Sequence, residues 1–364
     1  MKVQDHKLKI LHVPYRTFNS KSFEASKGFT LIELMVALVL GLLISAAALQ
    51  IFYTSSVNSR RQEASSQMQD NAIFGFSQIQ QHLRRANYGA KSTSAYDEFF
   101  MNHLTPQGGV VLTRPSGVAG KWLEGNLSGL VLNNAAVPSN LLSSNASSNS
   151  ISNLEGIANS DQLTIQYRSD RNDAFDCEGS TIPEGFYVIE RYFVRMDNTV
   201  TPNASGLACA SAIYDYDDTD AGSVSGIDIK DYTVPSEAAA KNNNLAGDGT
   251  IIIPNVDYFR AKLGVSPNRD FATDPENLVI AYIPIPTTTN LTTVLNNRRI
   301  VSLQIGILAR SNNPTATTQA NSDLAFTVLD RANVGLNNAA ITGPKYLRNV
   351  YETTVLLRNA RGGL

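Results

Sequence analysis

The sequence has few residues of the types on which enzymes and metal centres depend. It contains four histidines in 364 residues, and only His82 and His103 lie beyond residue 28. Two isolated histidines without a third ligand do not form a zinc site, and we expect a solvated or helix-packing role for His82. The sequence has no G-x-S-x-G nucleophile turn, no P-loop and no dinucleotide-binding glycine motif. We therefore expect no enzymatic activity, no catalytic residues, no metal centre built on histidine and no cofactor.

The charge balance gives little attraction for nucleic acid. Met1–Gly28 contains six basic and two acidic residues, whereas the whole chain has a formal net charge of −2, so the remainder is close to −6. Binding to DNA depends on phosphate contacts from clustered lysine and arginine. The mild acidity argues against a nucleic-acid partner but leaves a local basic patch open.

One long apolar run begins directly after the basic segment. Phe29–Tyr53 spans 25 residues, of which Glu33 alone is charged. A helix crosses the bilayer core with roughly 20 apolar residues, so this run is long enough to span a membrane. The basic flank favours the cytoplasmic side, which predicts a single-pass membrane protein whose remaining chain lies beyond the inner face of the membrane.

Three interpretations of this run differ in how they account for Glu33. A cleavable signal peptide has an apolar core of about 7–15 residues, which is shorter than this run. An ordinary signal anchor fits the length but leaves an intramembrane carboxylate without a role. In the third interpretation a peptidase cuts between Gly28 and Phe29. Glu33 then pairs with the free amine of a neighbouring subunit, because an unpaired charge in apolar surroundings is costly.

The stretch KGFTLIEL at Lys27–Leu34 resembles the class III signal of type IV pilins and pseudopilins. The resemblance implies that Met1–Gly28 is a leader peptide and that a prepilin peptidase cuts after Gly28. It also implies that Phe29 becomes a methylated N-terminus and that Glu33 sets the register of neighbouring subunits during assembly.

Beyond Tyr53 the sequence becomes polar but keeps the spacing of an amphipathic helix. Apolar residues recur at intervals of three and four, which predicts that residues 54–89 continue the membrane helix and turn one face to a domain. Tyr88-Gly89 is typical of a helix end, while Gly41 and Gly75 each weaken the helix by about 1 kcal/mol relative to alanine. The predicted apolar face consists of Val57, Ala64, Met68, Ala72, Phe76, Ile79 and Leu83.

The remainder of the chain predicts a β-rich domain. Residues 90–160 are irregular and include a Ser/Asn-rich insertion, with Val110–Leu112 and Leu130–Leu132 as short candidate strands. Residues 161–364 contain segments rich in β-branched and aromatic residues. We expect strands at Gln162–Tyr167, Gly185–Met196, Thr250–Gly264 interrupted at Pro254, Leu278–Ile283, Ile300–Leu308 and Tyr346–Leu357. The predicted fold is α+β, with one long N-terminal helix packed on an antiparallel, pilin-like β domain.

The chain has two cysteines, Cys177 and Cys209. The predicted topology places both in the periplasm, where disulfides persist, so we expect them to pair. Closing a loop of about 30 residues would stabilise the fold by roughly 3–4 kcal/mol in the chain-entropy treatment. Two buried free thiols are the alternative.

An acidic stretch, YDYDDTDAGSVSGID, follows the second cysteine. Asp215, Asp217, Asp218 and Asp220 offer calcium the oxygen ligands that it prefers. Their spacing does not match the EF-hand loop, which requires a glycine at the sixth position and a glutamate at the twelfth. A solvated loop is the alternative.

Several later blocks resemble PilW-type minor pilins, in the order in which they follow the pilin signal. They are DCEGS at Asp176–Ser180, ERYFVR at Glu190–Arg195, LAC at Leu207–Cys209, NVDYFRAKLGV at Asn255–Val265, IVSLQIGILARS at Ile300–Ser311 and YETTVLLRN at Tyr351–Asn359. The resemblance implies a low-abundance subunit that primes pilus assembly at or near the tip.

The same resemblance implies the partners and the cellular route of the protein. The partners are other minor pilins, the major pilin, the prepilin peptidase, the inner-membrane assembly platform and a tip adhesin. The protein is first a single-pass protein of the bacterial inner membrane, with its C-terminal domain in the periplasm, and is then part of the pilus at the cell surface. A pseudopilin of a type II secretion system shares the signal, although the 336 residues beyond the leader are many for that class. A tip adhesin or DNA-uptake subunit is a further alternative.

Overall fold

The structure is a computed structural model, and it describes the greater part of the chain. The described residues are 28–89, 107–112, 130–132, 135–145, 160–200, 204–214, 227–229, 232–233, 240–241, 244–267, 279–286, 295, 298–315, 325–335 and 343–360. Residues up to Ser56 and residues from Val57 onward form separate compact units, and each unit is described by itself.

One long helix, α1 (Leu31–Leu83), follows the start of the described chain. From Val57 onward the amphipathic face predicted from the sequence is confirmed. Val57 is half-buried, and the other predicted positions are buried: Ala64, Met68, Ala72, Phe76, Ile79 and Leu83. Beyond Leu83 the chain leaves the helix in a turn in which Asn87 and Gly89 have φ angles of 63° and 81°. Glycine and asparagine adopt this left-handed conformation most readily.

The strands of the second unit range in length from 2 residues in β2 to 13 residues in β14. Their bounds are β1 (Leu130–Leu132), β2 (Ala135–Ala136), β3 (Leu163–Arg168), β4 (Ala174–Phe175), β5 (Thr181–Ile182), β6 (Tyr187–Asp197), β7 (Ala204–Tyr214), β8 (Ile227–Ile229), β9 (Tyr232–Thr233), β10 (Ala240–Lys241), β11 (Thr250–Pro254), β12 (Val256–Pro267), β13 (Ala281–Pro284), β14 (Arg298–Arg310), β15 (Ala325–Val328), β16 (Arg331–Gly335) and β17 (Arg348–Leu356). Two 3-10 turns, η2 (Ser139–Leu141) and η5 (Arg358–Ala360), complete the described elements.

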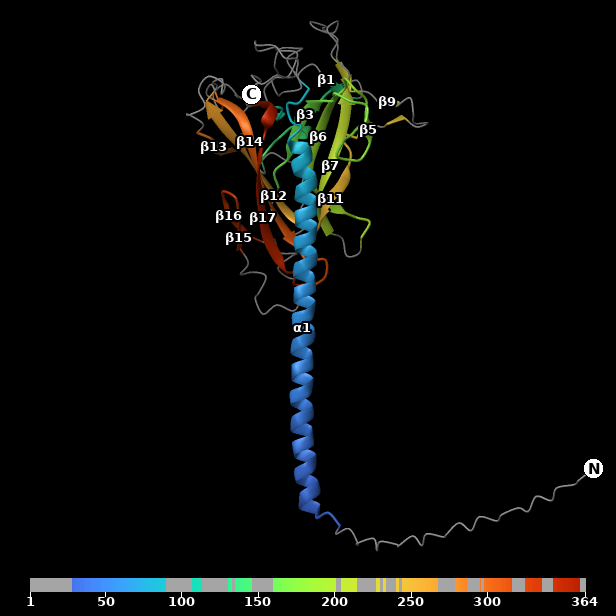
Figure 1. The fold of residues 1–364 in the computed structure, drawn as a ribbon, viewed down its shortest axis with the longest axis vertical. Helices are drawn as coiled ribbons and strands as arrows, with labels where there is room; N and C mark the ends of the chain where they lie inside the picture. Colours follow the sequence, from blue (N-terminus) through green and yellow to red (C-terminus); the bar gives the residue numbers. More distant parts are fainter. Residues whose placement is uncertain are drawn as a thin grey trace, which may run out of the picture. The chain divides into compact units, whose positions relative to one another are not determined.

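Two four-stranded antiparallel sheets form the body of this unit (Figure 1). The first sheet has the order β11-β7-β6-β3, and the second sheet has the order β13-β12-β14-β17. Smaller sheets join β2-β1-β8, β9-β10, β15-β16 and β4-β5, and in these β1 and β8 run parallel. The predicted α+β fold with antiparallel main sheets is therefore confirmed.

The C-terminal part of α1 lies across both main sheets. Figure 1 shows β7 and β11 on one side of this part of the helix and β12, β14 and β17 on the other. One apolar core joins the three layers, because burying one face of a helix against sheets removes the apolar area of all of them from water. Its members include Met68, Phe76 and Ile79 of α1, Tyr192 and Leu207 of the first sheet, and Phe259 and Ile305 of the second sheet.

The chain passes from the first sheet to the second at Pro254 and Asn255. β11 ends at Pro254, which confirms the interruption predicted there. Asn255 has a φ of 58°, and its carbonyl accepts a hydrogen bond from the backbone N–H of Arg310 at 2.8 Å. Asparagine tolerates this conformation at little cost, so one residue redirects the chain from one sheet into β12 of the other.

At Gly75 the helix α1 approaches the first sheet closely. A Cβ atom at this position would overlap Cγ1 of Ile253, a fully buried residue of β11. The weak point that the sequence predicts at Gly75 is therefore also a packing requirement of the helix against the sheet.

Replacing Gly75 by leucine is expected to destabilise the protein by about 1–3 kcal/mol through overpacking. This loss of stability should appear even though replacing a glycine inside a helix usually stabilises the helix by about 1 kcal/mol. Chemical denaturation of the full chain in detergent measures it. The control is Gly335→Leu on β16, where an added Cβ meets nothing within 4 Å. Equal stability of the two variants would contradict the close approach.

Candidate functional site

The N-terminal end of α1 is built by Thr30 and Glu33. The Glu33 backbone N–H donates to Oγ1 of Thr30 at 3.3 Å, and the Thr30 backbone N–H donates to Oε2 of Glu33 at 2.9 Å. The Thr30 hydroxyl also donates to the same carboxylate oxygen at 2.9 Å. This reciprocal pair is a capping box, which satisfies backbone donors that would otherwise lack partners at a helix start.

The capping box gives Glu33 a role within its own chain. A carboxylate in the first turn of a helix is also favoured by the helix dipole. The pattern T-x-x-E immediately before an apolar run is the signal that could have predicted the role of Thr30, a residue that the sequence analysis did not select. Gly28 and Phe29, the predicted cleavage pair, precede the helix, and Phe29 is 89% exposed.

The first part of α1 presents apolar side chains on all sides. Every residue from Leu31 to Tyr53 is exposed in the isolated chain. Of the described helices, α1 alone is long and apolar enough to cross a membrane, judged by length and composition. A surface of this kind is stable only when lipid or other proteins cover it.

Glu190 on β6 is the centre of a buried polar cluster in the first sheet. Its fully buried carboxylate accepts hydrogen bonds from the hydroxyls of Tyr167 at 2.8 Å and Tyr192 at 2.7 Å. The backbone N–H of Cys177 donates to it at 3.0 Å. Nδ1 of His82 on α1 lies 3.0 Å from the same carboxylate. One carboxylate therefore ties the helix, two strands and the cysteine loop together.

The surroundings of Glu190 keep it charged. Burial alone would raise the pKa of Glu190, but the electrostatic interaction with His82 and the hydrogen bonds from His82, Tyr192 and Tyr167 hold that pKa below its ordinary value. Burial and the nearby carboxylate raise the pKa of Tyr167 and Tyr192 well above the ordinary value. Both tyrosines therefore remain protonated and donate to Glu190.

The position of His82 differs from one of the two alternatives predicted for it. The solvated alternative is wrong, because the His82 side chain is 10% exposed and is paired with Glu190. The two residues are 108 positions apart in the sequence. The periodicity of α1 places His82 on the buried face next to Leu83, but no local pattern identifies its partner.

Cys177 and Cys209 form a disulfide, the pairing that the sequence analysis expects. Their Cα atoms are 6.1 Å apart, and both residues are buried. The bond joins the loop between β4 and β5 to β7. Within that loop Asp176 accepts hydrogen bonds from the backbone N–H groups of Glu178 at 3.1 Å and Ser180 at 2.7 Å. The DCEGS block therefore forms a turn that presents Cys177 to β7.

Polar contacts of β12 join strands within the second sheet and link this sheet to neighbouring segments. Asp257 on β12 lies 2.7 Å from Nε of Arg348 on β17 and accepts a hydrogen bond from the Ser205 hydroxyl on β7 at 3.0 Å. Arg260, also on β12, lies between Asp161 at 3.1 Å and Asp330 at 3.0 Å. Both β12 residues belong to the block NVDYFRAKLGV, so this block carries polar contacts between the sheets as well as apolar core positions.

Some predicted positions lie outside the described residues. They are Met1–Lys27 of the leader, His103 and the calcium candidates Asp215, Asp217, Asp218 and Asp220. Within the part of the chain that the structure describes, no group of three or more His, Cys, Asp or Glu side chains is placed to hold a metal ion.

Two protein families match parts of the chain. Residues 229–359 match PilW, Type IV Pilus-assembly protein W, and residues 25–49 match the prokaryotic N-terminal methylation motif. No curated protein matches the chain. Among solved structures the chain is similar to the Type IV-like pilin TTHA1219 from Thermus thermophilus, at 13% identity over 57% of this chain and 81% of that chain, with a TM-score of 0.25. The two family matches confirm the resemblance to PilW-type pilins, which are structural subunits and not enzymes.

Proposed function

We propose that this chain, a pilin-like protein with a PilW segment behind a pilin-type N-terminal signal, is a minor pilin that primes assembly of a type IV pilus at or near its tip. The observation that carries the proposal is the combination in one chain of the methylation motif at residues 25–49 and the PilW segment at residues 229–359. The apolar first part of α1 begins within the motif, and the same helix continues into the apolar core of the β domain.

The proposed path begins in the inner membrane. The apolar part of α1 anchors the precursor, with the basic leader in the cytoplasm and the β domain in the periplasm. A prepilin peptidase removes Met1–Gly28 and methylates Phe29. The exposed, non-helical position of Gly28 and Phe29 supports this step, because a peptidase needs an extended and accessible backbone.

Glu33 is proposed to set the register of this subunit against its neighbours. The Glu33 carboxylate accepts hydrogen bonds from the amide and the hydroxyl of Thr30, which lies three residues earlier in the sequence. These contacts hold the carboxylate at the N-terminal end of α1. A neighbour's free amine would replace or share these contacts when the apolar surface of α1 leaves the lipid. The β domain is proposed to contact other minor pilins, the major pilin and a tip adhesin, and the assembly platform is proposed to move the subunit out of the membrane.

Deletion of the gene tests the proposal through the amount of pilin that can be sheared from the cell surface. We expect surface pili to disappear in the deletion strain and to return when the retraction motor is also removed, because a priming subunit becomes dispensable when filaments are no longer withdrawn. Unchanged pili together with failed secretion of exoproteins would contradict the proposal and favour the type II secretion pseudopilin.

A further inference from the structure

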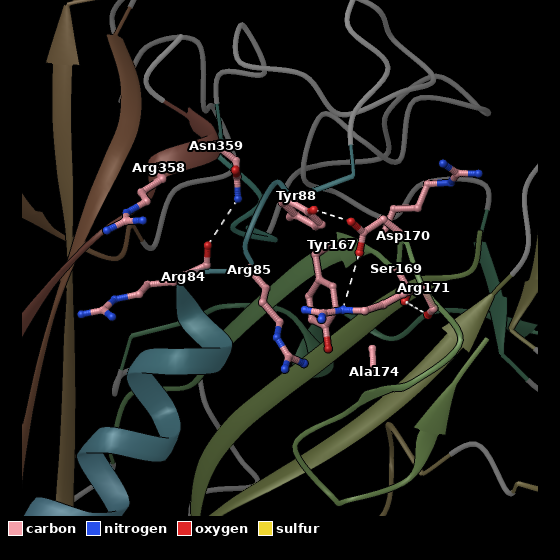
Figure 2. Close-up of a pocket in the computed structure, with 11 residues that line it drawn as sticks. Arg84, Arg85, Tyr88, Tyr167, Ser169, Asp170, Arg171, Ala174, Arg358 and Asn359 are labelled. Carbon is pink, nitrogen blue, oxygen red and sulfur yellow. Dashed lines mark hydrogen bonds and ion pairs between the residues drawn. The ribbon is translucent and has the colours of Figure 1, made fainter. Parts of the chain in front are cut away.

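A cavity of about 400 Å³ lies at the end of the first sheet where α1 stops. Its walls come from three parts of the chain that are far apart in the sequence: residues 84–88 after α1, residues 167–174 at the end of β3, and residues 358–359 in η5 (Figure 2). We refer to it as the arginine cleft, because five of its lining residues are Arg84, Arg85, Arg168, Arg171 and Arg358.

Hydrogen bonds to backbone carbonyls hold the three walls of the arginine cleft together. The backbone N–H of Arg168 donates to the carbonyl of Tyr88 at 2.9 Å. The Asn359 side-chain amide donates to the carbonyl of Arg84 at 3.3 Å, and the Asn87 amide donates to the carbonyl of Asn359 at 3.0 Å. A cleft held by hydrogen bonds between its walls is pre-organised for a ligand, which lowers the entropic cost of binding.

Three of the five arginines are used by the fold. Arg85 donates to the carbonyl of Phe175 at 2.6 Å, and Arg168 donates to the carbonyl of Gly185 at 2.9 Å. Arg171 lies 3.9 Å from Asp170 and 3.8 Å from the neighbouring carboxylate of Asp173.

Arg84 and Arg358 are different, because both are exposed and neither forms an ion pair with any carboxylate of the described chain. Figure 2 shows their side chains extending toward the same side of the cleft. Both guanidinium groups line the same cleft, so an anionic segment that binds there can pair with each of them. The planar fork of each group fits a carboxylate or phosphate through two hydrogen bonds.

We propose that the arginine cleft binds an acidic segment of a partner protein, whose carboxylates pair with Arg84 and Arg358. The rim of the cleft favours a short acidic segment over a polyanion. Asp170 and Asp173 lie beside the arginines with side chains 51% and 82% exposed. A nucleic acid carries about one charge per 1.7 Å along its axis, so its phosphates would meet these carboxylates. On the proposed function, this partner is a neighbouring pilus subunit, and this identification rests on that function.

The test measures binding of a labelled, end-capped peptide with two adjacent acidic residues to the full chain in detergent, by fluorescence anisotropy. We expect binding that weakens as the ionic strength rises, and no binding of the same peptide with amides in place of the carboxylates. The double variant Arg84→Gln and Arg358→Gln should bind the acidic peptide about tenfold or more weakly, since it loses two charge-assisted pairs.

The matched control is Arg298→Gln, another exposed arginine, which lies on β14. It should bind the peptide as the unaltered chain does, and all three chains should unfold at the same temperature, because Arg84 and Arg358 donate no side-chain hydrogen bond to the described fold. Equal binding of the peptide by the double variant and the control would overturn the proposal. So would tighter binding of a single-stranded oligonucleotide than of the peptide. Either failure would leave the pilus phenotype of the deletion strain untouched, so the two proposals fail independently.

Discussion

Replacing Gly28 by arginine is expected to leave the leader on the chain and to remove the protein from pili. The new side chain would occupy the position that the peptidase must accept next to the cut. A Cβ atom at Gly28 meets nothing within 4 Å, so the substitution should not disturb the fold. We expect complete loss of processing, visible as a chain heavier by residues 1–28, and no protein in the sheared pilus fraction.

The control for this prediction is Gly41→Ala. Gly41 lies in the same apolar part of α1, and an added Cβ there also meets nothing within 4 Å. This variant should be cut normally, because its change is remote from the cleavage pair. A Gly28→Arg chain that reaches pili at the normal level would contradict cleavage after Gly28.

Replacing Glu190 by alanine is expected to destabilise the β domain by about 3–5 kcal/mol, because several buried donors lose their acceptor and each such loss costs about 1–3 kcal/mol. The substitution leaves His82, both tyrosine hydroxyls and the Cys177 N–H without their acceptor. Denaturant unfolding of the full chain in detergent measures the loss. The control Glu63→Ala removes an exposed carboxylate of α1 that contacts Gln67. Similar losses in both variants would contradict a central role for Glu190.

The contribution of Glu190 should depend on pH in a defined direction. The pKa of Glu190 is lowered in the folded protein. As the pH falls below the ordinary glutamate pKa of about 4.3, Glu190 is therefore protonated in the unfolded chain before it is protonated in the folded protein. The stabilisation is therefore complete above that pH and is lost as the pH falls through the lower pKa of the folded state. The difference in stability between the unaltered chain and Glu190→Gln should narrow in acid. A gap that widens in acid would contradict this sign.

Local patterns in the sequence predict the elements whose stability is local. The spacing of Ala64, Met68 and Ala72 fixes the buried face of α1, and Pro254 fixes the boundary between β11 and β12, because each depends on neighbours in the chain. β7 was not predicted. Its sequence, ASGLACASAIY, is rich in small residues of low β propensity. It is a strand because β6 and β11 flank it and supply the hydrogen bonds on both edges.

The parts of the site that could not be predicted are those assembled across the chain. Glu190 meets His82 only after the first sheet packs on α1, and neither residue type is unusual in its own segment. The arginine cleft likewise combines Arg84, Arg168 and Arg358 from three distant segments. Thr30 is the exception, since its capping box with Glu33 is encoded within four residues and could have been predicted directly.

Mass spectrometry of sheared pili tests the central claim, that this chain is processed and built into the filament. The account predicts an N-terminal peptide that begins at Phe29 and carries one methyl group on its amine, in the pilus fraction and at low abundance relative to the major pilin. A chain found only in the membrane fraction, with residues 1–28 still attached, would contradict it.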